Sequence, residues 1–209
     1  MITVDFQNNS NNDEPINIVV YTKNEQSSFD SLELAWVVFK NSGQGDGGTI
    51  TYPTSGFVQG FFTEGGATQH TKKIPVDNGK LYQLWNDPDA GTVIVEAGSA
   101  GAGDEVDVKN GLSKGEISVT YFKGQDIDTA GAIATIPKIN PDDKAVFELL
   151  PKLYFAVASN ITRGDVLNSA DLTDPTQIDL LNVVSCTVEL TGGGGDPYEF
   201  KKTHVKKGS

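Results

Sequence analysis

The stretch KLYQLWNDPDAGTVI, residues 80–94, brings an aromatic ring together with amide and carboxylate groups. Trp85 is followed directly by Asn86 and Asp87, and Asp89 comes two positions later. Sugar sites use this combination, because the ring stacks on the apolar face of a pyranose while polar groups hydrogen-bond its hydroxyls. We therefore take Trp85, Asn86, Asp87 and Asp89 as candidate ligand-binding residues.

The same residues have a simpler interpretation as the corner of a hairpin. Proline fixes φ and a following glycine tolerates positive φ, so Asp-Pro-Asp-Ala-Gly suits a turn between two strands. The similar stretch KLYFAVASNITRGDVL, residues 152–167, has the turn without these acids. The sequence therefore favours a hairpin corner, but a metal or sugar site at the same turn remains an alternative.

Calcium is the most reasonable metal, since hard cations take carboxylate, amide and backbone oxygens from acidic loops. The candidate ligands are Asp87 and Asp89 in NDPDAG, and Asp104, Glu105 and Asp107 in GAGDEVD. Neither loop has the spacing of an EF-hand or of a calcium-binding nonapeptide repeat. Glu105 and Asp107 fall on one face of a strand, where a solvated sheet edge also explains them.

The chain lacks the residues that several common catalytic and metal sites require. The chain has two histidines and one cysteine, and no Gly-x-Ser-x-Gly elbow, which disfavours a hydrolytic triad, a catalytic zinc site and a disulfide framework. The glycine-rich runs at 43–48 and 192–195 lack the lysine and serine or threonine of a phosphate-binding loop. We expect that the protein is not an enzyme. If it were one, a glycosidase that uses two carboxylates would be the class that the sequence still allows.

A second aromatic group lies in TYPTSGFVQGFF, with Tyr52, Phe57, Phe61 and Phe62. Tyr52 is included among the candidate ligand contacts. The segment 49–63 also fits the lipid-facing hairpin of a pore-forming protein, although the edge of a core is the favoured interpretation. Trp36, in LELAWVVF, is flanked by apolar residues and is expected in the core.

The elements that must position these residues are strands. Period-two alternation recurs in about eleven segments rich in Val, Ile, Thr, Tyr and Phe, separated by clusters of Gly, Pro, Asn and Asp. No window of about 12 residues has a convincing 3.6-residue period. The sequence predicts an all-β, antiparallel sandwich with little helix, either one large sandwich or two packed β halves.

Two stretches in the first half of the chain are similar to two stretches in the second half. VDFQN (4–8) followed by INIVVYTKN (16–24) is similar to VDVKN (106–110) followed by EISVTYFKG (116–124). The stretches 80–94 and 152–167 form a second similar pair in the same order. A duplication would explain both pairs, and chance repetition of alternating strand patterns would explain them as well.

The boundary between the copies is expected at the glycine-rich segment 98–104, which gives a first β half at 1–97 and a second at 105–209. The two halves either fold separately or pack as one body. The end of the chain, FKKTHVKKGS, has four lysines and no acid, and we expect it to be a frayed basic tail.

The 209 residues carry a formal net charge of −12, which disfavours nucleic acid as a partner of the body of the protein. No stretch approaches the length of a transmembrane helix, and the sequence as supplied shows no signal peptide. A cytoplasmic location is slightly favoured, because the chain has a single cysteine.

The favoured function is non-enzymatic recognition, in which loops at one end of a sandwich bind a glycan or another extended surface. A self-assembling coat, inclusion or other structural protein is the alternative, and homo-oligomers fit that alternative. A β pore-forming toxin is a third possibility. No motif in the chain identifies a known family.

Overall fold

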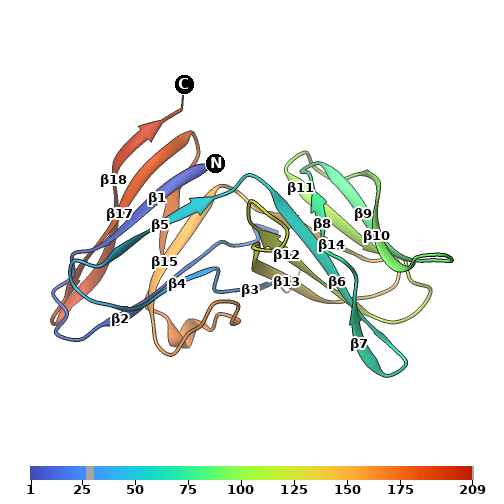
Figure 1. Cartoon of the computed structure of the whole chain (residues 1–209), viewed down its shortest axis with the longest axis horizontal. Helices are drawn as coiled ribbons and strands as arrows, with labels where there is room; N and C mark the ends of the chain where they lie inside the picture. The colour runs from blue at the N-terminus through green and yellow to red at the C-terminus, as the bar shows by residue number, and fades with distance from the viewer. Residues whose placement is uncertain (27–30, 209) are drawn as a thin grey trace. The chain divides into compact units, whose positions relative to one another are not determined.

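The computed structural model describes residues 1–26 and 31–208. The prediction of an all-β protein with little helix is confirmed, because 61% of the chain is strand and no helix among the described residues reaches seven residues. Several antiparallel sheets are packed together, consistent with an all-β sandwich (Figure 1). The helical structure in the described part is the 3₁₀ turn η1 (Ser169–Asp171).

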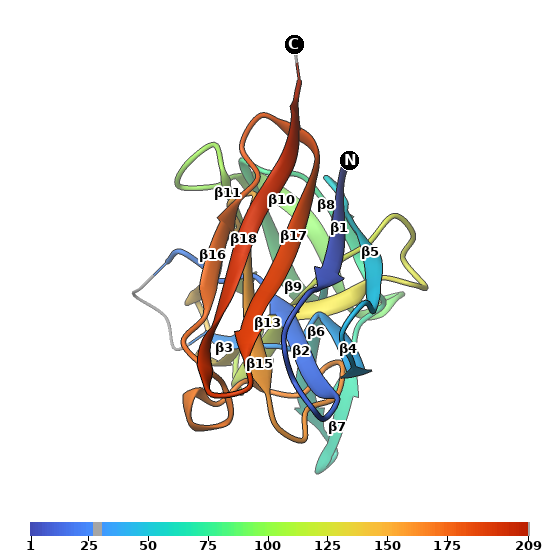
Figure 2. The same cartoon turned by 90° about the vertical axis from the view of Figure 1, so that its left-hand side faces the viewer.

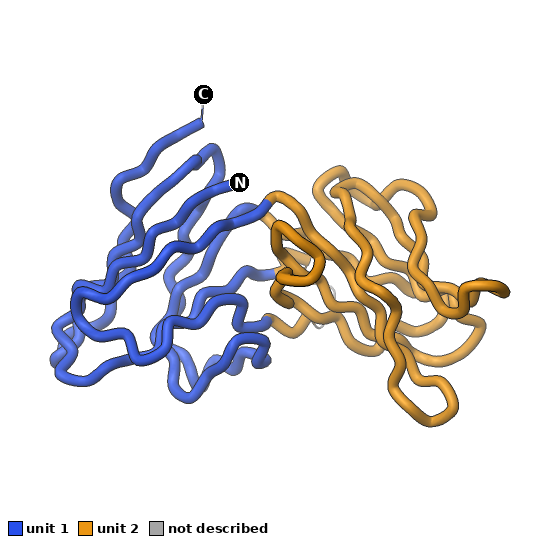
Figure 3. Tube along the Cα trace, viewed as in Figure 1, with its two compact units in different colours: residues 1–23, 34–53, 151–209 blue, residues 24–33, 54–150 orange. Residues whose placement is uncertain are grey.

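The strands group into two compact units, coloured blue and orange in Figure 3. Unit 1 consists of Met1–Lys23, Leu34–Pro53 and Pro151–Ser209, and unit 2 of Asn24–Glu33 and Thr54–Leu150. Each unit therefore combines residues from both predicted halves. The segment 98–104, where we placed the boundary between the halves, lies within unit 2.

Unit 1 contains two four-stranded sheets. The hydrogen-bonded order of the first is β18 (Asp196–Lys207), β17 (Val183–Gly193), β1 (Ile2–Asn8) and β5 (Gly47–Tyr52). The order of the second is β16 (Thr176–Asp179), β15 (Lys152–Ala158), β2 (Ile16–Tyr21) and β4 (Val37–Ser42). Figure 2 shows β17 between β18 and β1, which joins the two ends of the chain in one sheet.

Unit 2 contains a four-stranded and a six-stranded sheet. The first has the order β10 (Gly91–Ser99), β9 (Lys80–Asp87), β11 (Glu105–Asn110) and β14 (Lys144–Glu148). The second has the order β3 (Leu32–Glu33), β13 (Gly131–Ile139), β12 (Ile117–Lys123), β6 (Gly56–Glu64) and β7 (Ala67–His70), and β8 (Ile74–Val76) also pairs with β6.

The core of unit 1 follows from strand alternation. Val4, Phe6 and Asn8 of β1 are buried, whereas Asp5 and Gln7 between them are exposed. The Phe6 ring stacks on Phe155 of β15 with 6.2 Å between centroids, which joins the two sheets. Alternate apolar residues thus supply the buried face that a sandwich requires.

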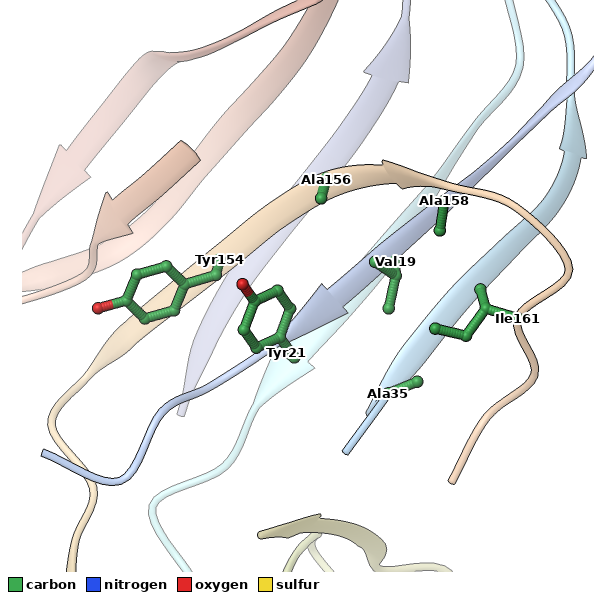
Figure 4. Packing of buried hydrophobic residues seen from close by; sticks show 7 residues of the cluster. All are labelled: Val19, Tyr21, Ala35, Tyr154, Ala156, Ala158 and Ile161. Atoms are coloured by element: carbon green, nitrogen blue, oxygen red, sulfur yellow. The ribbon is translucent and has the colours of Figure 1, made fainter. Parts of the chain in front are cut away.

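A second apolar cluster in unit 1 lies on the neighbouring positions of β2 and β15 (Figure 4). Tyr21 and Tyr154 stack with centroids 5.4 Å apart, and the Lys23 ammonium lies 4.6 Å from the Tyr154 ring centroid. Ile161, from the segment after β15, packs against this cluster. Strands β2 and β15 are therefore buried on both faces, which explains their continuous apolar runs.

The core of unit 2 depends on a close approach between strands of its two sheets. A Cβ added to Gly60 of β6 would lie 2.2 Å from the Leu84 side chain of β9, so glycine is needed there. Tyr121 of β12 and Phe147 of β14 pack with centroids 5.5 Å apart. The first contact packs β6 against β9, the two strands that lead to the candidate site, and the second packs β12 against β14 of the same two sheets.

The expectation of a frayed basic tail was wrong. Residues Asp196–Lys207 form β18 and pair with β17, with Lys207 opposite Val183. The adjacent lysines at 201–202 and 206–207 interrupt the apolar alternation, so the sequence pattern did not reveal the strand. Within the described residues, no helix is long and apolar enough to cross a membrane.

Candidate functional site

An open hollow of about 350 Å³ lies in unit 2, and we call it the unit 2 hollow. Its polar lining comes from three segments: Thr63 and Glu64 at the end of β6, Asn86 and Thr92 of the β9–β10 hairpin, and Ser113 and Lys114 after β11. Phe62 and Leu112 add apolar surface. One opening thus presents hydroxyl, amide, carboxylate and ammonium groups.

Asn86 is the predicted ligand-binding residue that lines this hollow. It stands opposite Thr92 across the β9–β10 hairpin, and the Thr92 hydroxyl donates a hydrogen bond to Asn86 Oδ1. This bond orients the Asn86 amide at the exposed end of β9, so the hairpin register positions the side chain.

The Asp-Pro-Asp turn is a hairpin corner in the structure. Asp87 Oδ1 accepts hydrogen bonds from the backbone N–H groups of Ala90 and Asp89, each at 2.9 Å. These two bonds hold the pKa of the Asp87 carboxyl below its usual value. Asp89 is exposed on the same turn. The Asp87 carboxylate therefore stabilises the turn, as the simpler interpretation of the sequence expected.

Trp85 does not line the hollow, although it precedes Asn86 in sequence. Successive side chains of a strand point to opposite faces, so Trp85 lies on the other face of β9 from Leu84 and Asn86. Its indole Nε1 is buried and has no hydrogen-bond partner among the described residues. Trp85 and Asn86 are neighbours in sequence, but the strand places their side chains on opposite faces, so they do not form one site.

The acidic residues considered for calcium are engaged elsewhere. Asp107 is 1% exposed and pairs with Lys144 at 2.5 Å, so the expectation that it lies on a solvated edge was wrong. It belongs to β11, which lies between β9 and β14 and not at an edge. Glu105 accepts hydrogen bonds from Gln26 Nε2 and from the Ala102 N–H.

Asp104 is exposed at the start of β11. Among residues 1–26 and 31–208, no group of three or more His, Cys, Asp or Glu side chains is placed to hold a metal ion. The five predicted calcium ligands, Asp87, Asp89, Asp104, Glu105 and Asp107, are thus not gathered into one metal-binding group.

Tyr52 belongs to the core of unit 1 and is 4% exposed. Its ring meets that of Trp36 edge-on, with centroids 6.0 Å apart. In unit 2, Phe57 and Phe62 are also buried. Most of the TYPTSGFVQGFF aromatics therefore form core edges, and Tyr52 has little surface to offer a ligand.

The sequence did not predict the other polar residues of the hollow, namely Thr63, Glu64, Thr92, Ser113 and Lys114. One signal was present: a hairpin centred on NDPDAG places Thr92 opposite Asn86. The contributions from β6 and from the segment after β11 depend on long-range strand pairing, and single-strand patterns do not determine such pairing.

Comparison with known proteins gives a family. The sequence model of the RhiA family, described as RhiA, matches residues 1–195. The chain belongs to the RhiA family. No curated protein and no solved structure matches this member of the family.

Proposed function

We propose that this RhiA-family chain is a non-enzymatic recognition protein that binds a glycan in the unit 2 hollow. The observation that supports the proposal is the convergence of six polar side chains from three segments around one opening. Its volume of about 350 Å³ falls within the usual range for small-ligand sites.

The chemistry of the lining suits a polyhydroxylated ligand. Sugar hydroxyls donate and accept hydrogen bonds, and the hollow offers groups of both kinds in Asn86, Ser113 and Thr63. Lys114 supplies a donor and Glu64 an acceptor of opposite charge. The half-buried Leu112 provides apolar surface for the carbon-bearing face of the ring, and the buried Phe62 forms the wall behind it.

The test is a calorimetric and thermal-shift screen against a glycan panel. A ligand at 100 times its Kd should stabilise the protein by roughly 2.7 kcal/mol. Asn86→Ala and Lys114→Ala should each weaken the binding of a hit about tenfold, since each loses one hydrogen bond.

Two control variants separate this site from the one expected from the sequence. Asp89→Ala and Trp85→Phe change residues outside the hollow and should leave affinity within twofold of the wild type. A panel without hits would reject the proposal. Binding that depends on Trp85 and not on Asn86 would reject the hollow as the site.

Self-assembly is a second candidate, and the β10 edge favours it. Strand β10 is an edge strand of its sheet and carries one charged residue, Glu96. Its Val95 is 42% exposed. Edge strands with few charges are templates for pairing with another chain. Light scattering after size exclusion should show a mass that rises with concentration, and Val95→Lys should reverse the rise.

A further inference from the structure

The two units are built from strands in the same pattern. In unit 1, β1 pairs in parallel with β17, which forms a hairpin with β18, while β5 pairs with the other side of β1. In unit 2, β11 pairs in parallel with β9, which forms a hairpin with β10, while β14 pairs with the other side of β11. The described parallel pairings thus fall at matching places.

The opposing sheets match as well. Strand β2 lies between β15 and β4, and β15 also pairs with β16. Strand β12 lies between β6 and β13, and β6 also pairs with β8. Both β2 and β12 have a register irregularity near their start, between Ile16 and Ile18 and between Ile117 and Val119.

The correspondence extends to single hydrogen bonds in the first four strands of each pattern. Asn8 Nδ2 donates to the Ser42 carbonyl at 3.1 Å, and Asn110 Nδ2 donates to the Ile139 carbonyl at 2.9 Å. Each Oδ1 accepts from the backbone N–H two residues later, in Ser10 and Leu112.

The turns that hold these amides correspond too. The N–H groups of Asn8 and Asn110 donate to the carbonyls of Asp46 and Asp143, and their own carbonyls accept from Gly45 and Asp142. The two turns have positive φ at the same places, namely Asn41 and Gly45 in one and Lys138 and Asp142 in the other. Left-handed φ at a lysine is uncommon, so its match with Asn41 is informative.

The last four strands correspond in the same way. Thr71 Oγ1 accepts from the Gly60 N–H at 3.1 Å, and Thr173 Oγ1 accepts from the Val157 N–H at 3.0 Å. The N–H groups of Thr71 and Thr173 donate back to the carbonyls of the same two residues, at 2.9 Å in both cases. Such reciprocal pairs do not follow from hydrophobic alternation alone.

We infer that residues 1–99 and 105–207 are two copies of one eight-stranded repeat that have exchanged their second halves. The first half of copy 1 is β1, β2, β4 and β5, and its second half is β6, β8, β9 and β10. In copy 2 these are β11–β14 and β15–β18. Unit 1 joins the first half of copy 1 to the second half of copy 2, and unit 2 joins the other two halves.

The face where the halves meet is therefore an interaction surface whose partner is a second copy of the same repeat. In unit 1 it consists of the parallel β1–β17 ladder, the β2–β15 ladder and the stack of Phe6 on Phe155. One copy in this arrangement, taken alone, leaves both ladders open and removes Phe155 from Phe6. Completing the sandwich requires strands from the other copy.

Cleavage between the copies in the folded full-length chain tests the exchange. A protease recognition sequence replaces residues 100–103, an exposed segment apart from Ala100, and the protein is cut after purification. We expect the fragments to stay together as one particle near 22.3 kDa on native size exclusion after hundredfold dilution, and to separate only with unfolding in urea. Two folded particles of about half that mass would overturn the exchange.

Exchange of turns tests the duplication independently of the cut. The sequence 140–143, NPDD, is replaced by 43–46, GQGD, which has Gly45 with positive φ at the place of Asp142 and leaves Lys144 and the buried Ile139 unchanged. The melting temperature should stay within a few degrees of the wild type. A control variant carries the same four residues in the order GGQD, which places glutamine at the position of Gly45. Equal losses in the two variants would overturn the equivalence of the turns.

Discussion

Asn8 and Asn110 make the same four hydrogen bonds in different units. Both side chains are fully buried at the last position of a central strand, where the turn after β4 or β13 closes over them. A buried amide with its hydrogen-bonding groups satisfied is a rigid and specific element of a core.

Removing either amide should destabilise its unit. In Asn110→Ala, the carbonyls of Ile139 and Gly115 and the N–H of Leu112 lose their partner. Leaving buried polar groups unsatisfied should lower the free energy of unfolding by about 2 to 3 kcal/mol. Urea denaturation measures the loss. The exposed Asn9 is the matched control, and Asn9→Ala should change stability by about 0.5 kcal/mol or less.

The Asp107–Lys144 pair should show strong coupling. Asp107 is buried, and Lys144 is half-exposed at the opposite end of the ion pair. Lys144→Met leaves the carboxylate buried without its cation, which should cost about 2 kcal/mol after allowance for solvent around the lysine. The double variant Asp107→Leu, Lys144→Met should lose less than Lys144→Met alone. Additive losses in urea denaturation would show that the pair is uncoupled.

Lys123 should make the protein more stable as pH rises above 8. Burial lowers the pKa of this lysine from 10.5 to about 8. The unfolded chain therefore binds more protons between these values, so the free energy of unfolding rises with pH there, by up to about 3 kcal/mol.

Comparison with Lys123→Met isolates this effect. Burial also raises the pKa of Tyr121 and Cys186, which lowers stability in both proteins as pH rises through the ordinary pKa values of these groups. The difference in free energy of unfolding between wild type and variant, measured in urea from pH 7 to 10, should change steadily in favour of the wild type. A constant difference would contradict the assigned cause.

The Asp87 carboxylate should protect the backbone of its turn from opening. Because two backbone N–H groups lower its pKa, the stabilising bonds are present above the ordinary carboxyl range and are lost as pH falls through the folded pKa. Asp87→Ala should speed amide hydrogen exchange at Asp89 and Ala90 at neutral pH. Asp89→Ala should leave the exchange of the Ala90 amide nearly unchanged.

Part of the fold could be predicted from sequence because strand alternation is a local property. The similarity of VDFQN to VDVKN pointed to β1 and β11, which occupy matching places in the two units. The similarity of 80–94 to 152–167 compared β9 with β15, whereas the pairing pattern matches β9 to β17. Alternation makes many strands look alike, so it identifies strands better than it identifies their partners.

The candidate site shows the same limit. Asn86 could be found from its place beside a turn, but the pleat separates Trp85 from it. Glu64 and Lys114 come to the hollow through β6 and through the segment after β11, strands whose partners lie far away in sequence. Asp107 looked like an exposed acid because nothing near it in sequence shows that Lys144 is its partner.

The parallel pairing of β1 with β17 has a consequence for how a ribosome delivers this protein. Strand β1 leaves the ribosome long before β17, so its parallel partner is absent while β2–β16 are synthesised. Most of unit 2 comes from the continuous stretch 54–150 and can close earlier. During that interval the apolar faces of β1 and β2 lack their covering strands, so nascent chains need protection from one another until β15 and β17 have emerged.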